Sequence, residues 1–137
     1  MNPPPILDVL PHRPPFLFVD EIVEVAGESA HCRFRMPDRE DSFAGRIFGE
    51  LVLVEALAQT TAVHVGVSSP DAGPAVGLLG GVEKLAFEDR PRPGDAIDLF
   101  CTRIRALGPI AMYRVEAQRD GERLCRATLT VRSGGVP

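Results

Sequence analysis

The sequence predicts an α+β fold in which an antiparallel sheet of about six strands wraps around one long central helix. Two observations support this prediction. Strand-like segments come as two before and four after a single long apolar segment, and most connections between them are short and contain glycine or proline. Such connections join antiparallel neighbours. Because 137 residues is the length of one ordinary domain, we expect residues 1–137 to form a single domain.

The first third of the chain predicts a short helical turn followed by a hairpin. The turn lies at 5–10, PILDVL, and ends at the next proline, which cannot continue a helix. Strands are predicted at 16–25, FLFVDEIVEV, and at 29–36, SAHCRFRM, and the Ala-Gly-Glu connection between them favours a hairpin. Residues 37–48 are polar and aperiodic, which is typical of a loop.

The stretch from Gly49 to about Gly66 predicts the long helix. It contains no proline and is rich in Leu, Val and Ala, and at ~1.5 Å per residue it would be about 27 Å long. It is apolar on nearly every side, whereas a surface helix carries a charged face. We therefore expect other parts of the structure to wrap it. Turn-forming residues at 68–75 then predict a loop.

The rest of the chain predicts four strands, at 76–88, 96–107, 110–118 and 123–133. The last two are joined by Arg-Asp-Gly-Glu, and an Asp-Gly pair is typical of a tight hairpin.

Composition excludes several classes of function. The chain has 19 acidic and 15 basic side chains, for a net charge of −4, so no basic face for nucleic acid is expected. Its three cysteines follow neither a disulfide framework nor a zinc-binding spacing. We expect no metal site, and we expect buried thiols in a reducing cytosol at Cys32, Cys101 and Cys125.

The sequence also gives no membrane signal. Its start lacks the basic cluster and apolar core of a signal peptide, and no run approaches ~18 apolar residues without a charge. We therefore expect a cytoplasmic protein that does not enter the membrane.

Three blocks resemble the bacterial β-hydroxyacyl-acyl-carrier-protein dehydratases in order and spacing. They are LPHRPPFLFVDEI (10–22), LVLVEALAQ (51–59) and GVEKLAFEDRPRPGD (81–95), and the resemblance covers roughly residues 5–132. It implies the hot-dog fold and a homodimer whose acyl tunnel runs along the subunit interface. The implied substrate is a thioester of acyl carrier protein or coenzyme A, and no metal or organic cofactor is implied.

In that family a His takes the α-proton of a 3-hydroxyacyl thioester, and a helix carboxylate of the partner subunit assists loss of the hydroxyl. The resemblance places this carboxylate at Glu55. A Glu on an apolar helix is costly unless it is paired or functional, so we expect Glu55 to line a cavity. The alternative is an exposed surface Glu. Gln59, one turn later on the same face, either orients Glu55 or satisfies the core.

The sequence departs from the family at the base. The family motif His-Phe-Pro-Gly aligns with Ser42-Phe43-Ala44-Gly45 if one residue is deleted before Ile47, and without a gap it puts Asp41 in the His place. Loss of a general base costs ~10²- to 10⁴-fold in rate. Ser lacks its own base and an ordinary Asp is too acidic to match a carbon acid, so Asp41 and Ser42 are weak candidate replacements.

The three histidines of the chain are candidate substitutes for the missing base. We expect His12, in the PHR block, to fix its loop, and His31 to lie on a solvated strand face. His64 follows Glu55 by nine residues, about 180° round a helix, so the two share no face within one chain.

The resemblance places carbonyl-polarising amides near Gly49 and Glu50, where a helix N-terminus favours an oxyanion. Here Gly-Glu replaces the family's Pro-Gly. Glu50 suits the helix dipole, but its carboxylate would also repel an enolate. A β-bulge would equally explain the Gly80-Gly81 pair. The residues expected near the acyl chain are Phe48, Gly49, Gln59, Gly80 and Gly81.

The segment EALAQTTAVHVG also resembles the helix of a divergent branch associated with aryl-polyene biosynthesis, whose members lack the usual His and partner a complete dehydratase. Three functions stay open. The chain is a dehydratase, or a subunit of one, acting on 3-hydroxyacyl thioesters of acyl carrier protein; or a hot-dog thioesterase that uses Glu55; or a non-catalytic acyl-binding subunit. We expect either a homodimer or a heterodimer with a complete dehydratase.

A docking patch for an acidic carrier protein should be basic. The candidates are Lys84, Arg90 and Arg92, although Asp89 and Asp95 beside them are equally typical of a solvated loop.

Overall fold

The computed structural model describes residues 3–38, 49–68 and 77–133. Within these ranges the chain forms two helices and six strands, in the order α1 (Ile6–Val9), β1 (Glu21–Ala26), β2 (Ser29–Arg35), α2 (Leu51–Ser68), β3 (Gly77–Phe87), β4 (Ala96–Leu107), β5 (Ile110–Arg119) and β6 (Glu122–Ser133).

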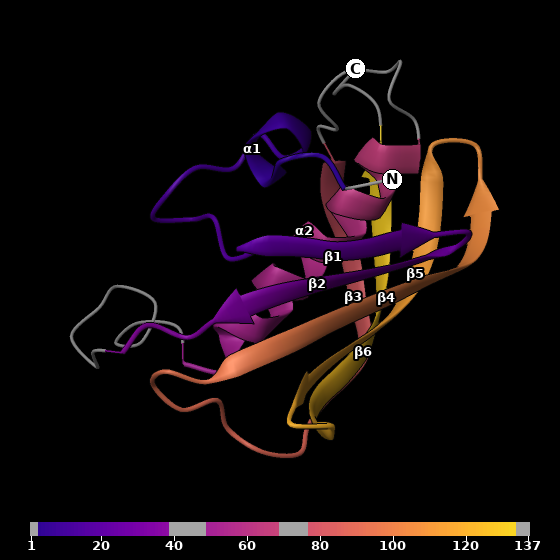
Figure 1. Cartoon of the computed structure of the whole chain (residues 1–137). Coiled ribbons are helices and arrows are strands. Elements are labelled where there is room, and N and C mark those ends of the chain that lie inside the picture. The colour runs from indigo at the N-terminus through magenta and orange to yellow at the C-terminus, as the bar shows by residue number, and fades with distance from the viewer. Residues whose placement is uncertain (1–2, 39–48, 69–76, 134–137) are drawn as a thin grey trace.

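The six strands form one sheet in the order β1-β2-β4-β5-β6-β3, and every neighbouring pair is antiparallel. The sheet curves around α2, which lies against β2, β4 and β5 (Figure 1). The predicted α+β class, with about six strands around one long helix, is therefore confirmed, and the architecture is the hot-dog fold. β3 lies at one edge of the sheet, beside β6.

The first strand begins later than predicted. Residues 16–20 were expected to open it, but the strand starts at Glu21. The side chain of Gln59, on α2, hydrogen bonds the backbone at Phe16 and Phe18 instead. A buried side chain thus replaces a neighbouring strand as the hydrogen-bond partner of this segment.

The long helix begins at Leu51 and ends at Ser68, so both its start and its end lie two residues later than predicted. Gly49 has a positive φ of 49°, which lies outside the helical region and favours glycine, so the chain turns there and the helix starts after it. Most of the two predicted loops on either side, residues 39–48 and 69–76, falls outside the described residues.

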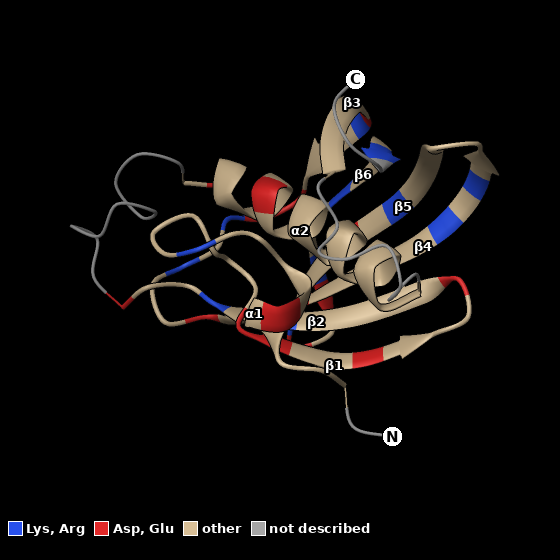
Figure 2. Cartoon of the chain, turned by 90° about the horizontal axis from the view of Figure 1, so that it is seen from above, with Lys and Arg blue, Asp and Glu red and all other residues tan. Residues whose placement is uncertain are grey.

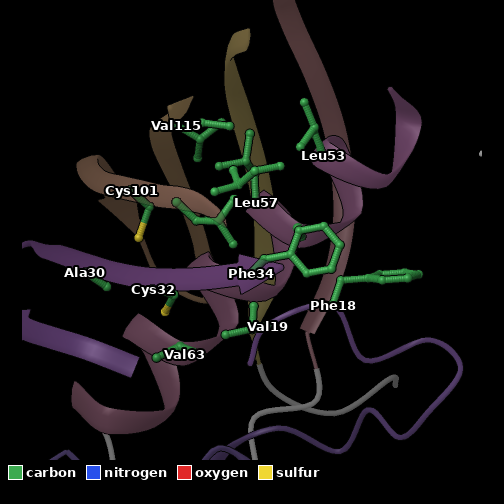
Figure 3. Close-up of a cluster of buried hydrophobic side chains, with 14 of the residues drawn as sticks. Phe18, Val19, Ala30, Cys32, Phe34, Leu53, Leu57, Val63, Cys101 and Val115 are labelled. Carbon is green, nitrogen blue, oxygen red and sulfur yellow. The ribbon is translucent and has the colours of Figure 1, made fainter. Parts of the chain in front are cut away.

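One side of α2 packs into a continuous apolar core shared with β2, β4, β5 and β6 (Figure 3). Leu53, Leu57 and Val63 are fully buried, as are the unpaired thiols predicted at Cys32, Cys101 and Cys125. The other side, which includes Val54, Glu55, Ala58 and Ala62, is only half-buried. Within one chain, therefore, α2 is not wrapped on every side as its composition suggested.

The same helix is long and apolar enough to cross a membrane by length and composition alone. Half of it is buried inside the fold, and it carries Glu55 in its middle. These are the properties of a core helix.

Candidate active site

Glu55 lies on the half-buried side of α2, with its side chain 40% exposed, between two cavities. The larger, of about 430 Å³, is lined by Phe16, Phe18, Leu51, Val52, Val54 and Glu55. The smaller, of about 200 Å³, is lined by His12, Glu55, Ala58, Gln59, Ala62, Gly77, Leu78, Leu79 and Val131. One cavity has an almost entirely apolar lining and the other includes polar groups, and the carboxylate borders both.

The side-chain amide of Gln59 holds Glu55 and the preceding loop together. Gln59 is buried, and its Oε1 accepts a hydrogen bond from the Phe18 N–H at 2.8 Å. Its Nε2 donates to the Phe16 carbonyl at 2.7 Å and to Glu55 Oε1 at 3.1 Å. Because the Phe18 N–H requires an acceptor, the orientation of the amide is fixed. Gln59 therefore both orients Glu55 and satisfies the core.

His12 lies beside Glu55, which sequence reasoning missed. Its Nε2 is 3.8 Å from Glu55 Oε1, and its Nδ1 is buried without a hydrogen-bond partner among the described residues. We had expected His12 to fix its loop, but Arg13 does so, donating to the carbonyls of Leu7, Leu10 and His12. Nothing in the spacing of residues 12 and 55 signals their contact, since it depends on the path of a loop rich in proline.

The other two histidines lie away from Glu55. His64 is fully buried, and its Nε2 donates to the Gly27 carbonyl at 2.9 Å, so its Nδ1 accepts from the Tyr113 hydroxyl at 2.7 Å. Burial raises the pKa of Tyr113 above its ordinary value, which keeps this hydroxyl protonated as the donor. His31 contacts Asp98 at 2.7 Å and stacks on Phe100. Both histidines have structural partners.

Two backbone N–H groups at the start of α2 are already hydrogen bonded and are not free to bind an oxyanion. The Val52 and Leu53 N–H groups already bond the Gly49 and Glu50 carbonyls, at 3.3 and 3.0 Å. The Glu50 carboxylate forms an ion pair with Arg90, which offsets part of the repulsion that an enolate would meet there. The base candidates Asp41 and Ser42, and Phe48, lie outside the described residues.

The glycine pair on β3 forms part of a β-bulge. The register shifts between Leu79 and Gly81, and a Cβ added at Gly80 or Gly81 would meet ordinary van der Waals contacts on Thr130. The bulge explains the pair without a close backbone approach. Three neighbouring residues, Gly77, Leu78 and Leu79, line the cavity beside Glu55 instead.

The expected basic patch is partly neutralised. Arg90 is paired with Glu50, and Arg119 bonds both Asp89 and Asp95, at 2.6 and 2.8 Å. Figure 2 shows basic residues along β4, β5 and β6, while α2 carries none. Others lie on β2, at Arg33 and Arg35, and on β3, at Lys84. Charge on this surface is therefore mixed around the loop that joins β3 and β4.

Comparison with known proteins relates this geometry to one group. Residues 4–134 match the family model ApeP-like, described as ApeP dehydratase. The 3-hydroxyacyl-[acyl-carrier-protein] dehydratase FabZ of Oceanobacillus iheyensis is 35% identical over 131 residues, which cover 91% of this chain and 93% of that protein. FabZ of Bacillus pumilus is 36% identical over 135 residues, with coverage of 94% and 93%.

Solved structures share the fold. The dehydratase heterocomplex ApeI:P from Xenorhabdus doucetiae matches with a TM-score of 0.83 and 16% identity, covering 96% of this chain and 92% of that chain. A hypothetical thioesterase with coenzyme A from Streptococcus pneumoniae matches with a TM-score of 0.63 and 12% identity, covering 84% and 85%. At these identities the structural likeness describes architecture alone.

Proposed function

Because the chain belongs to the ApeP-like dehydratase family, we propose that it is one subunit of a dehydratase that acts on 3-hydroxyacyl thioesters of acyl carrier protein. In this proposal Glu55 is the acid that protonates the departing hydroxyl, and a complete dehydratase subunit supplies the His that takes the α-proton. The observation that carries the proposal is the position of Glu55, between an apolar and a polar cavity on a half-buried helix face.

Dehydration needs two groups, a base that removes the α-proton and an acid that protonates the leaving hydroxyl. The C–H bond at the α-carbon and the C–O bond at the β-carbon break, a C=C bond forms, and water leaves. Hydroxide is a poor leaving group, so a carboxylic acid must deliver a proton to it. Glu55 suits this role, and Gln59 holds one of its oxygens at 3.1 Å.

The two cavities suit different parts of the substrate. The larger cavity presents the rings of Phe16 and Phe18 and the side chains of Leu51, Val52 and Val54, which suit an acyl chain. The smaller one presents the polar groups His12, Glu55 and Gln59, which suit the hydroxyl end. Glu55 then stands where the two parts meet.

The exposed edge of the sheet supports a dimer. β3 is an edge strand, and five of its large apolar side chains are 38–49% exposed: Leu78, Leu79, Val82, Leu85 and Phe87. An apolar, unpaired edge of this length is a liability unless another chain covers it. Leu78 and Leu79 also line the cavity at Glu55, so a partner on β3 would close the site. The missing family His favours a heterodimer.

The test is a mass-spectrometric assay with 3-hydroxyacyl thioesters of acyl carrier protein, scored for loss of water and for free thiol. We expect binding without turnover by this chain alone, and loss of water once it is co-purified with a dehydratase of the same organism that keeps the His-Phe-Pro-Gly motif. Glu55→Gln should lower that rate by ~10²- to 10⁴-fold, whereas the exposed Glu122→Gln should not.

Two outcomes would contradict the proposal. Loss of water by the isolated chain would show that no partner His is needed. Free thiol that depends on Glu55 would make the protein a thioesterase, the alternative use of a single helix carboxylate in this fold.

A further inference from the structure

We propose that His12 is a positioning residue that, through an N–H on Nε2, joins Gln59 in holding Oε1 of Glu55 and leaves Oε2 as the oxygen that exchanges a proton with the ligand. The inference deepens the proposed function and rests on it for the catalytic consequence. The geometry that suggests it is the approach of His12 to Glu55 across the 200 Å³ cavity.

The tautomer of His12 follows from the surroundings of its two nitrogens. Nδ1 is buried and has no hydrogen-bond partner among the described residues. A proton on Nδ1 would therefore be a buried donor without an acceptor, which costs about 1–3 kcal/mol. An unprotonated Nδ1 also lacks a partner, but in that tautomer the N–H on Nε2 points toward the Glu55 carboxylate, whereas the Nδ1–H tautomer would turn the lone pair of Nε2 toward it. The favoured tautomer therefore has its proton on Nε2, the nitrogen that faces Glu55.

The two donors converge on one carboxylate oxygen. Gln59 Nε2 donates to Glu55 Oε1 at 3.1 Å, and His12 Nε2 lies 3.8 Å from the same atom. The longer distance exceeds a hydrogen bond, but contacts in a catalytic site often tighten when ligand binds, and a water can bridge such a gap. Oε2 of Glu55 has no hydrogen-bond partner within the described ranges.

This arrangement decides where the proton is carried. With Oε1 bonded by Gln59 and, once the site tightens on ligand, by His12 as well, a protonated Glu55 holds its hydrogen on Oε2. As the base of the partner subunit takes the α-proton and the C=C bond forms, transfer of the Oε2 proton to the substrate hydroxyl lets the C–O bond break, which releases water and leaves a carboxylate on Glu55. The negative charge that develops on Glu55 is then stabilised at Oε1 by donors already in place.

The backbone around His12 is built to hold this position. Arg13 Nη1 donates to the Leu10 and His12 carbonyls, each at 2.7 Å. Gln59 bonds Phe16 and Phe18 on the far side of the same loop. The loop is therefore fixed on both sides of His12 by residues other than His12, which leaves the imidazole free for Glu55.

The first experiment reads the tautomer directly and needs no turnover. We would record long-range ¹H–¹⁵N correlations of the histidine rings in the full chain, and assign His12 by its loss in His12→Gln. We expect the Nε2–H tautomer for the neutral ring of His12 and a shift of its Nε2 resonance in Glu55→Gln, with His31 unchanged. An Nδ1–H tautomer, or no response of His12 to Glu55→Gln, would overturn the inference whatever the protein catalyses.

The second experiment measures the catalytic consequence in the active complex. His12→Leu removes the donor and should lower kcat by about 10- to 100-fold with KM little changed. His12→Gln keeps an N–H donor at similar reach and should restore most of that loss, which a purely structural role would not produce. The matched pair His31→Leu and His31→Gln should leave kcat unchanged. Equal kcat in His12→Leu and wild type, at equal melting temperature, would refute the positioning role.

Discussion

At the scale of single residues, Gln59 links packing to chemistry. The same amide that reaches Glu55 also bonds the backbone at Phe16 and Phe18, and Phe18 packs edge-on against Phe34 in the core. Removing this buried amide would leave its backbone partners without hydrogen bonds, which is costly inside a protein. The position of the candidate acid is therefore tied to the stability of the fold.

We expect Gln59→Leu to destabilise the protein by about 1–3 kcal/mol, because the buried Phe18 N–H loses its acceptor. Urea unfolding of the variant and the wild type would measure this. Gln118→Leu, on β5, serves as the control, since the side chain of Gln118 makes no hydrogen bond to the part of the chain that the structure describes. Equal midpoints for Gln59→Leu and wild type would argue against the tight coupling of the loop to α2.

The three thiols give a prediction that depends on pH. Burial raises the pKa of Cys32 and Cys101 to about 12 and that of Cys125 to about 11, and only the thiolate is reactive. We expect all three to resist a thiol reagent at pH 8 in the folded chain and to react fully in denaturant. Rapid reaction of one thiol in the native protein would contradict the structure at that position.

At the scale of elements, α2 and β3 are each incomplete within one chain. The helix keeps a half-buried face around Glu55, and the strand exposes an apolar edge. Both meet at the small cavity, to which β3 contributes Gly77, Leu78 and Leu79. The half-buried face of α2 and the exposed edge of β3 adjoin one another, so one partner chain would cover both.

We expect Val82→Asp to weaken the proposed dimer. Val82 is a central residue of β3 and is 38% exposed, so a buried, unpaired carboxylate would appear in any interface formed there. Sedimentation velocity should show a shift from dimer to monomer. Ile104→Asp, at an apolar residue of β4 that is 44% exposed, is the control and should remain dimeric. A dimer that survives Val82→Asp would move the interface to another surface.

At the scale of the whole molecule, ion pairs join parts of the chain that are distant in sequence. Partial burial alone would raise the pKa of Asp98, but hydrogen bonds from His31 and Arg33 outweigh it and hold this pKa below its ordinary value. The Arg90 backbone N–H and then Arg119 lower the pKa of Asp89, and Arg103 lowers that of Glu28. These pairs join β2 to β4, and they join β4 and β5 to the loops between strands.

The direction of these pKa shifts determines how the stability of the fold changes as pH falls. A carboxyl whose pKa is lower in the folded state stabilises the fold above its unfolded value, and that stabilisation is lost as pH falls through the folded pKa. For Asp98, with an ordinary value of 3.8, we expect Asp98→Asn to be less stable than wild type at pH 7. The difference should shrink below about pH 4.

Denaturant unfolding at a series of pH values would test this. The exposed turn residue Asp120 provides a matched control, since Asp120→Asn should change stability little at any pH. A gap between Asp98→Asn and wild type that stays constant down to pH 2 would mean that the carboxylate of Asp98 does not stabilise the fold through its charge.

The sequence by itself determined the fold class, the order of the elements and the family. Strand and helix patterns, turn residues and prolines act over a few neighbouring positions, so they can be recognised in a single sequence. The resemblance to the dehydratases was confirmed. The resemblance also pointed to Glu55 as a site residue, and Gln59 followed because it lies one turn later on the same face of the helix.

Only the tertiary structure decided what meets Glu55. The contact with His12, the Gln59 bonds that replace a strand at Phe16 and Phe18, and the pairing of Glu50 with Arg90 each join residues about 40 positions apart. The path of the loops and the packing of α2 against the sheet set these contacts, and no local pattern encodes a side-chain approach across that separation. The exposure of β3 is likewise a property of strand order, which depends on how the whole sheet closes around the helix.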